Sequence, residues 1–184
     1  MLPASILPAA VSEIVGAAGA VAFSGSRSPA TAATAEQLAA VLDIIRPGIP
    51  VLVGCARGVD AAVRSARADA FIFRVQEISG SATIARPYHF AKRSQWMIRT
   101  LAELPAPLLV AFPTGPCPAG LVPSSNARRC FAGHGSGTWA TAAFAAGLNI
   151  HVLICSQNIR DLNAWSAVPL SNDWLLIPSS RSAD

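Results

Sequence analysis

Short apolar runs alternate with longer amphipathic stretches along most of the chain. Five runs have the length of buried strands, namely Val21–Ser24, Val51–Val53, Ala70–Val75, Leu108–Phe112 and Ile150–Cys155. The four stretches between these runs have apolar residues at helical spacing, namely Ala35–Ile45, Gly58–Ala68, Tyr88–Leu104 and Thr138–Ala146. This alternation predicts an α/β fold, a Rossmann-like three-layer domain with a mostly parallel sheet flanked by helices.

Local signals predict where several elements begin and end. Thr34 is the expected N-cap of the helix over 35–45, and Gly147 is the expected C-cap of the helix over 138–146. Residues 76–87 and 113–134 are predicted to be loops, the second because of its prolines and small residues. In the tail, Asn172–Ile177 is predicted either to add an edge strand or to pack over the sheet.

The composition is that of a folded protein. Hydrophobic residues make up 52% of the 184 residues and charged residues 13%, which argues against disorder. No run has the character of a membrane-spanning helix, so we expect a cytoplasmic protein with no membrane partner. Residues 1–20 are apolar, but Glu13 interrupts them and no basic segment precedes them, so we expect an N-terminal helix rather than a signal peptide.

We therefore expect a single domain over residues 1–184. Its motif-bearing core covers about 20–155, with the N-terminal helix and the C-terminal tail packed on it. The four cysteines, Cys55, Cys117, Cys130 and Cys155, form no C-x-x-C pair, so we expect free thiols and no metal site. No cofactor is expected. The net charge of +4 permits an anionic partner without identifying one.

Glycine-containing motifs follow three of the predicted strands. Ser24–Arg27 follows the first strand and Gly54–Asp60 the second, and the loop after the fourth strand leads to Gly133–Thr138. Because the carboxyl ends of parallel strands meet at one edge of a sheet, these motifs are expected to form one ligand site. Arg57 offers a guanidinium to phosphate, and Asp60 either orients Arg57 or simply caps the next helix.

The strongest local motif is Gly133-His134-Gly135-Ser136-Gly137-Thr138, which is predicted to open a helix. Free N–H groups at a helix start favour an anion, so the motif predicts a phosphate site. It is not a Walker A loop, because no lysine follows the last glycine. The alternative is a tight turn in which Ser136 or Thr138 caps the helix.

The segment Arg86–Arg99 combines basic and aromatic side chains without an acidic one. Lys92, Trp96 and Arg99 lie at helical spacing and are candidate contacts for single-stranded nucleic acid. The alternative is an amphipathic helix that buries Met97 and Leu101 and leaves its charges in solvent.

These motifs, in this order, resemble those of the DprA/Smf and Lonely Guy superfamily, often called SLOG. The resemblance covers about residues 20–155, lies closest to a stand-alone DprA-like domain, and is carried by four segments: 21–27 (VAFSGSR), 56–60 (ARGVD), 93–97 (RSQWM) and 135–141 (GSGTWAT). It implies a nucleotide or single-stranded DNA ligand bound at the strand ends, with phosphate at the glycine-rich helix start, and it makes a homodimer a reasonable expectation.

The sequence departs from the hydrolase branch of that superfamily at one position. The resemblance places the catalytic glutamate of Lonely Guy enzymes at Thr141, which carries no carboxylate, and Ser94 stands where those enzymes have lysine or asparagine. Asp60 and His134 are the possible substitutes for the missing base. We therefore expect no catalytic residue.

Three functions remain open at this point. The favoured one is a nucleotide- or nucleic-acid-binding protein. The others are a nucleotide phosphoribohydrolase or N-glycosidase and a non-catalytic oligomerisation or protein-interaction domain. The residues expected to bind phosphate or nucleotide are Gly25, Ser26, Arg27, Arg57, Gly58, Asp60, Arg93, Gly135, Ser136, Gly137 and Thr138.

Overall fold

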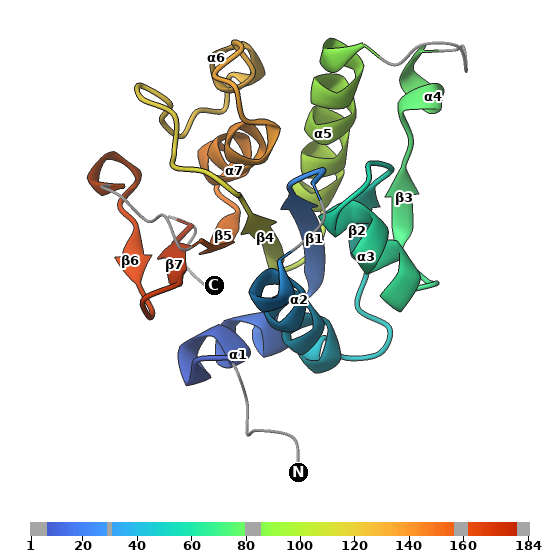
Figure 1. Cartoon of the computed structure of the whole chain (residues 1–184), viewed down its shortest axis with the longest axis vertical. Helices are drawn as coiled ribbons and strands as arrows, with labels where there is room; N and C mark the ends of the chain where they lie inside the picture. The colour runs from blue at the N-terminus through green and yellow to red at the C-terminus, as the bar shows by residue number, and fades with distance from the viewer. Residues whose placement is uncertain (1–6, 29–30, 80–85, 157–161, 180–184) are drawn as a thin grey trace.

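The computed structural model describes residues 7–28, 31–79, 86–156 and 162–179, whose strands form one sheet (Figure 1). The strands are β1 (Ala20–Gly25), β2 (Val51–Gly54), β3 (Phe71–Phe73), β4 (Pro107–Phe112), β5 (His151–Cys155), β6 (Val168–Pro169) and β7 (Trp174–Ile177). Their order is β3-β2-β1-β4-β5-β7-β6. β1 to β5 are mutually parallel, whereas β7 runs antiparallel to β5 and to β6. The chain is therefore an α/β protein with a mostly parallel sheet, as the sequence predicts.

Helices cover both faces of this sheet. On one face lie α1 (Ala9–Ala17), α2 (Ala32–Ile44) and α3 (Val59–Ala66). The other face carries α5 (Pro87–Ala102) and α7 (Gly137–Gly147), with the short helices α4 (Val75–Ser79) and α6 (Ala127–Cys130) beside them. A short 3-10 helix, Asn163–Trp165, follows in the tail. In Figure 1, α5 and α7 lie in the upper part of the view, whereas α1 and α2 lie below.

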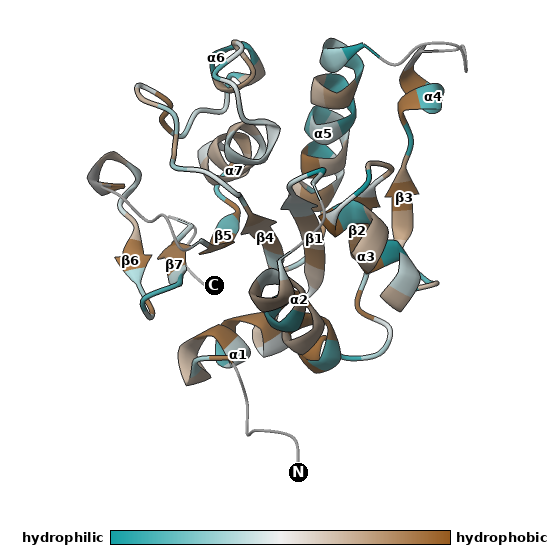
Figure 2. Ribbon diagram, viewed as in Figure 1, coloured by the Kyte–Doolittle hydropathy of each residue, from teal (hydrophilic) through white to brown (hydrophobic). Residues whose placement is uncertain are grey.

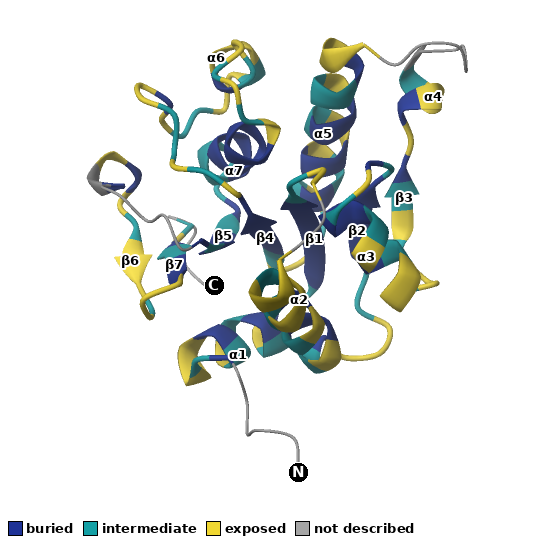
Figure 3. Cartoon of the chain, viewed as in Figure 1, coloured by how far each residue is buried: buried dark blue, intermediate teal, exposed yellow. Residues whose placement is uncertain are grey.

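The strands bury alternate residues against the two helical layers. Val21 and Phe23 of β1 belong to the apolar cluster under α1, α2 and α3, and Ala20 and Ala22 to the cluster under α5 and α7. This alternation follows from the two-residue period of a strand. Figure 2 shows hydrophobic residues along most of the strands, and Figure 3 shows the central strands as buried. None of the described helices is long and apolar enough to cross a bilayer.

Two predicted helix caps are wrong. Helix α2 begins at Ala32, and its N-cap is Thr31, whose Oγ1 accepts a hydrogen bond from the N–H of Thr34 at 3.2 Å. The helix starts earlier because the alanine-rich segment before 35 favours helix as well. Gly147 is the last residue of α7, which Leu148 caps. A glycine is needed there because a Cβ at Gly147 would overlap the backbone of Ser124.

Both predicted loops contain a helix. Val75, expected at the end of a strand, begins α4, and α5 begins at Pro87 within the segment predicted as loop. Residues 80–85 of that loop lie outside the described residues. In the loop over 113–134, Asn126 caps α6 by accepting from the N–H of Arg128 at 3.0 Å. Helices of four or five residues are too short to show a hydrophobic period in the sequence.

Both described ends of the chain pack on the sheet domain. Helix α1 occupies residues 9–17 and buries Val11 and Val15. In the tail, β7 joins the sheet beside β5, and β6 rather than β7 forms the edge. Trp174 is buried against α2, where its indole N–H donates to Oε1 of Gln37 at 3.0 Å.

Candidate functional site

A cavity of about 620 Å³ lies where β1, β2 and β4 end. Its walls are the β1–α2 loop, the start of α3, the first half of α5 and the N-terminus of α7. The crossovers leave the sheet in opposite directions here, because β1 leads to α2 on one face and β4 leads to α6 and α7 on the other. Parallel sheets bind ligands at such a point of reversal. The volume is that of an ordinary small-molecule pocket.

The structure brings most of the predicted site residues together around this cavity. Those that line it are Gly25, Ser26, Arg27, Asp60, Arg93, Gly135, Ser136, Gly137 and Thr138. They come from four segments far apart in the sequence, and the parallel sheet with its crossover helices brings all four to one edge.

The N-terminus of α7 forms one wall. Ser136 is the N-cap, and its Oγ accepts a hydrogen bond from the N–H of Trp139 at 3.4 Å. The capping alternative for Ser136 is therefore present in the structure. No described residue accepts a hydrogen bond from the N–H of Gly137 or of Thr138, and both residues line the cavity. These N–H groups carry the positive end of the helix dipole.

A buried ion pair forms the floor. Nη1 of Arg93 on α5 donates to Oδ2 of Asp60 on α3 at 2.9 Å, and Asp60 also accepts from the N–H of Ala56 at 3.2 Å. The Arg93 side chain is 8% exposed and that of Asp60 5%. Nε of Arg93 is buried and has no hydrogen-bond partner among the described residues. Arg93 itself lines the cavity, and its guanidinium has further N–H groups besides the one that it donates to Asp60.

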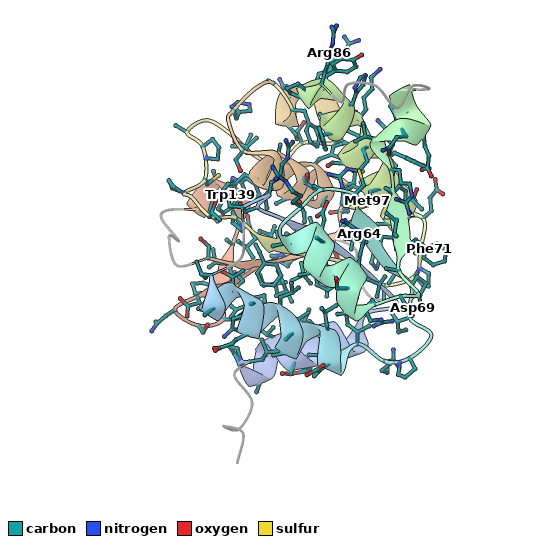
Figure 4. The ribbon with its side chains drawn as sticks, turned by 45° about the vertical axis from the view of Figure 1, so that its right-hand side comes forward. Arg64, Asp69, Phe71, Arg86, Met97 and Trp139 are labelled. Carbon is teal, nitrogen blue, oxygen red and sulfur yellow. The ribbon has the colours of Figure 1, made fainter. Side chains whose placement is uncertain are left out.

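Glycine at the end of β2 makes room for this pair. A Cβ on Gly54 would overlap Nη1 of Arg93 and Oδ2 of Asp60, so no other residue fits there without moving the pair. Arg64 of α3 holds the same turn from outside, since its Nη1 and Nη2 donate to the carbonyls of Gly54 at 2.6 Å and Ala56 at 2.9 Å. Figure 4 shows Arg64 on α3 and Met97 on α5 near the middle of the molecule.

Arg27 supplies a cation at the opening. Its guanidinium lies 4.1 Å from the centre of the Phe90 ring, and both residues line the cavity. Stacking of this kind holds an arginine in place while its N–H groups stay free for an anion. His134 also lines the cavity, with its Nε2 3.1 Å from the carbonyl oxygen of Arg129. Since Arg93 is paired with Asp60, Arg27 leaves the described lining with a net positive charge.

Two predicted contacts in the second motif lie elsewhere. Arg57 is exposed and does not line the cavity. Gly58 has a structural role instead. Its φ is +68°, and a Cβ at this position would overlap the carbonyl oxygen of Ser26. The N–H of Val59 donates a hydrogen bond to the same oxygen at 3.2 Å. Gly58 therefore lets the two strand-end loops interlock. Asp60 pairs with Arg93 rather than with Arg57.

The candidate nucleic-acid contacts lie on the exposed face of α5, outside the cavity. Trp96 packs edge-on against Phe73 with ring centres 4.7 Å apart. Lys92 lies over the ring of Tyr88 and Arg99 over that of Phe144, each at 5.6 Å. The opposite face of the helix buries Met97 and Leu101, as an amphipathic helix requires.

The position of the absent glutamate lies inside the site. Thr141 is 1% exposed, lines the cavity, and donates from Oγ1 to the carbonyl of Gly137 at 2.7 Å. Among the described lining residues Asp60 is the sole carboxylate, and it already has two hydrogen-bond donors. The cavity therefore presents no unpaired carboxylate from its described residues to act as a general base.

The cysteines near the site are unreactive by their surroundings. All four cysteines are free thiols. Cys130 lines the cavity, and burial raises the pKa of its thiol, which donates to the carbonyl of Ser124 at 3.3 Å. Burial also raises the pKa of Cys117 to about 11. A thiol that stays protonated is a poor nucleophile, so neither has the character of a catalytic cysteine.

The sequence analysis did not assign the aromatic side chains of the cavity wall, or Arg64, to the site. Tyr88, Phe90 and Phe131 line the cavity. The density of aromatic residues at the start of α5 was the signal for Tyr88 and Phe90, and it was interpreted as nucleic-acid stacking, whereas Phe131 had no such signal. Arg64 lies one helical turn after Asp60, a spacing that places both on one side of α3. That spacing could have identified Arg64 as part of the same turn.

The described residues thus form one cationic, partly aromatic cavity at the edge of a parallel sheet. Comparison of the chain with family models, with curated proteins and with solved structures finds no match.

Proposed function

We propose that this protein binds a nucleotide, with a phosphate at the N-terminus of α7 and the nucleoside in the rest of the cavity. The observation that carries the proposal is that the N–H groups of Gly137 and Thr138 have no acceptor among the described residues, while both residues line a cavity with a net cationic lining. Each element of the proposal rests on a different part of that lining.

The phosphate position rests on electrostatics. The N–H groups at the start of α7 need acceptors, and a phosphate oxygen supplies one without desolvating another protein group. Arg27 adds a guanidinium held over the Phe90 ring, and Arg93, which also lines the cavity, adds the guanidinium N–H groups that Asp60 does not occupy. Arginine and helix-terminal N–H groups are the donors that proteins use most for phosphate.

The nucleoside position rests on the apolar part of the cavity. Tyr88 and Phe90 line it from the first turns of α5, Phe131 from beyond α6, and Met97 from deeper in α5. Aromatic faces stack on a base, and a sulfur atom packs well against a ring. A nucleotide has the matching combination of a flat apolar ring and an anionic group.

A small nucleotide fits better than a nucleic-acid strand. The cavity volume of about 620 Å³ is that of a small-molecule pocket. The side chains that suit a strand, Lys92, Trp96 and Arg99, do not line it, and Trp96 is already packed against Phe73. Binding of a strand would need a second surface on the outside of α5.

The family proposal rests on where the shared motifs lie. We propose a Rossmann-like fold of the SLOG type, which the strand order 3-2-1-4-5 in the parallel part of the sheet supports. The four segments that resemble that superfamily all contribute residues to the cavity wall, from Phe23–Arg27, Asp60, Arg93–Met97 and Gly135–Thr141. Binding is favoured over hydrolysis because Thr141 replaces the expected glutamate.

One pair of variants tests the phosphate position. Gly137→Pro removes a single N–H donor at the first position of α7, where proline is tolerated, and nothing lies within 4 Å of a Cβ there. Gly137→Ala keeps the N–H and is the matched control. Titration calorimetry with AMP is expected to show an affinity about tenfold lower for Gly137→Pro than for Gly137→Ala. Equal affinities would contradict the proposed phosphate position.

The same preparation tests binding against hydrolysis. Chromatography of an incubation with AMP is expected to show intact nucleotide and no free adenine. Release of adenine by the wild type, lost in Asp60→Asn, would replace the binding proposal with the phosphoribohydrolase.

A further inference from the structure

A second, smaller cavity of about 180 Å³ opens beside the first, on the face of the sheet that α2 covers. Ser26 and Thr114, at the ends of β1 and β4, line both cavities. These strand ends are joined, since the N–H of Ser26 donates to the carbonyl of Phe112 at 3.3 Å. The two cavities are therefore neighbours, with the strand ends where the crossovers reverse direction as their common wall.

A long ligand in the crevice outside these strand ends would reach both cavities. Reversal of the crossovers leaves a crevice outside the carboxyl ends of the strands, and long ligands lie along it. The cationic cavity is under α5 and α7, and the smaller one is beside α2 and β7. At less than a third of the volume of the first cavity, the second holds one ring rather than a whole nucleotide.

The chemistry of the second cavity is opposite to that of the first. Asp173 is the sole charged residue among its described lining residues. Cys155 lines the same cavity, where burial and, to a smaller extent, the Asp173 charge raise the pKa of its thiol. The remaining polar groups include the hydroxyls of Ser28 and Thr31. A phosphate would be repelled here, whereas hydrogen-bond donors are favoured.

Gln37 adds a donor of known direction. The Trp174 indole N–H, which can only donate, lies 3.0 Å from Oε1 of Gln37 and so fixes which end of the amide is oxygen. No described residue accepts a hydrogen bond from the Nε2 group of Gln37, and Gln37 lines the cavity. The cavity thus offers a carboxylate acceptor from Asp173 and an amide donor from Gln37.

We propose that this second cavity is a sugar subsite of the same ligand, which makes the ligand class nucleoside diphosphate sugars. The inference rests on the proposed function, because the first cavity must hold the nucleotide phosphates. Sugar hydroxyls both donate and accept, so they satisfy Asp173 and Gln37 together. An ammonium group only donates and would leave the Gln37 amide without an acceptor.

The experiment compares three probes by titration calorimetry: AMP, ADP and ADP-ribose, which adds a second ribose to the diphosphate. The wild type is expected to bind ADP-ribose about tenfold more tightly than ADP. Gln37→Glu keeps an oxygen for the Trp174 indole and removes the amide donor. Asp173→Asn removes the carboxylate charge. Each is expected to abolish most of the tenfold increment while leaving the ADP affinity within about twofold of the wild type.

Glu36→Gln, the reverse exchange at the exposed neighbouring position, is the matched control and is expected to retain the increment. The sugar subsite would be overturned by equal affinities for ADP and ADP-ribose, or by an increment that is unchanged in both Gln37→Glu and Asp173→Asn. In either case, binding of AMP would leave the proposed function standing. Failure to bind all three probes would overturn both.

Discussion

Arg93 and Asp60 form a buried ion pair that ties the middle of α5 to the first turn of α3, with 2.9 Å between Nη1 and Oδ2. The pair lies under the cavity, and Asp60 also accepts from the N–H of Ala56 in the loop after β2. Three elements therefore depend on one carboxylate. Its primary part is to hold the cavity floor in position, while the guanidinium N–H groups of Arg93 that it does not occupy are left for a ligand.

The first prediction concerns the stability of this pair. Asp60→Ala and Arg93→Ala are each expected to lower the free energy of unfolding by about 3–5 kcal/mol, because each leaves the other charge buried without a partner. Urea denaturation of the purified variants measures this. Asp69→Ala removes the carboxylate of the Arg67–Asp69 pair, whose Asp69 side chain is 59% exposed, and is expected to leave stability essentially unchanged. Similar losses for Arg93→Ala and Asp69→Ala would contradict the structural part assigned to the buried pair.

The second prediction concerns Gly54. A methyl group there would overlap the Arg93 guanidinium, so Gly54→Ala is expected to lower the free energy of unfolding by about 1–3 kcal/mol and to weaken AMP binding. The control is Gly16→Ala in α1, where nothing lies within 4 Å of the added Cβ. That change is expected to raise stability by about 0.5–1 kcal/mol, because alanine loses less backbone freedom in a helix. Thermal and urea unfolding of both variants would show whether the two effects have opposite signs.

The third prediction compares Arg27 with Arg57, two arginines that the sequence analysis assigned to the same phosphate site. Arg27→Ala is expected to weaken AMP binding by about tenfold or more, because Arg27 lines the cavity and no described acid pairs with it. Arg57→Ala removes the same charge from an exposed position outside the cavity and is expected to leave the affinity within about twofold. Calorimetry at two salt concentrations checks both values. Equal losses for the two variants would mean that net charge, rather than the cavity, determines binding.

The fourth prediction concerns alkaline pH. Burial, with a smaller effect of the Asp173 charge, raises the pKa of the Cys155 thiol from 9.0 to about 12. Between these values the unfolded chain releases a proton that the folded protein keeps, so the stability that Cys155 contributes is complete below pH 9 and is lost as the pH rises toward 12. Unfolding free energies measured across this range are expected to fall less steeply for Cys155→Ala than for the wild type. Parallel curves for the two proteins would contradict this assignment.

Much of the fold follows from the sequence alone. Each parallel strand is a short apolar run such as Leu108–Phe112, and strands of this kind must be buried on both faces, so the alternation with helices already implies a covered parallel sheet. The approximate cavity position follows as well, because parallel strands carry Ser24–Arg27 and Gly133–Thr138 to one edge. Element ends were less well predicted. The short helices α4 and α6 depend on local caps and packing rather than on a hydrophobic period.

The sequence by itself thus determined which residue types gather at the strand ends, since chain order and strand direction suffice for that. Only the tertiary structure decided their partners. Arg93 and Asp60 are 33 positions apart and Gln37 and Trp174 are 137 apart, and no local pattern pairs residues at such separations. Arg57 and Arg93 are alike as sequence letters, yet packing turns one toward solvent and buries the other beneath the cavity. The burial of a charge and its distance from other charges determine how strongly it interacts, and both are fixed only when the helices pack on the sheet.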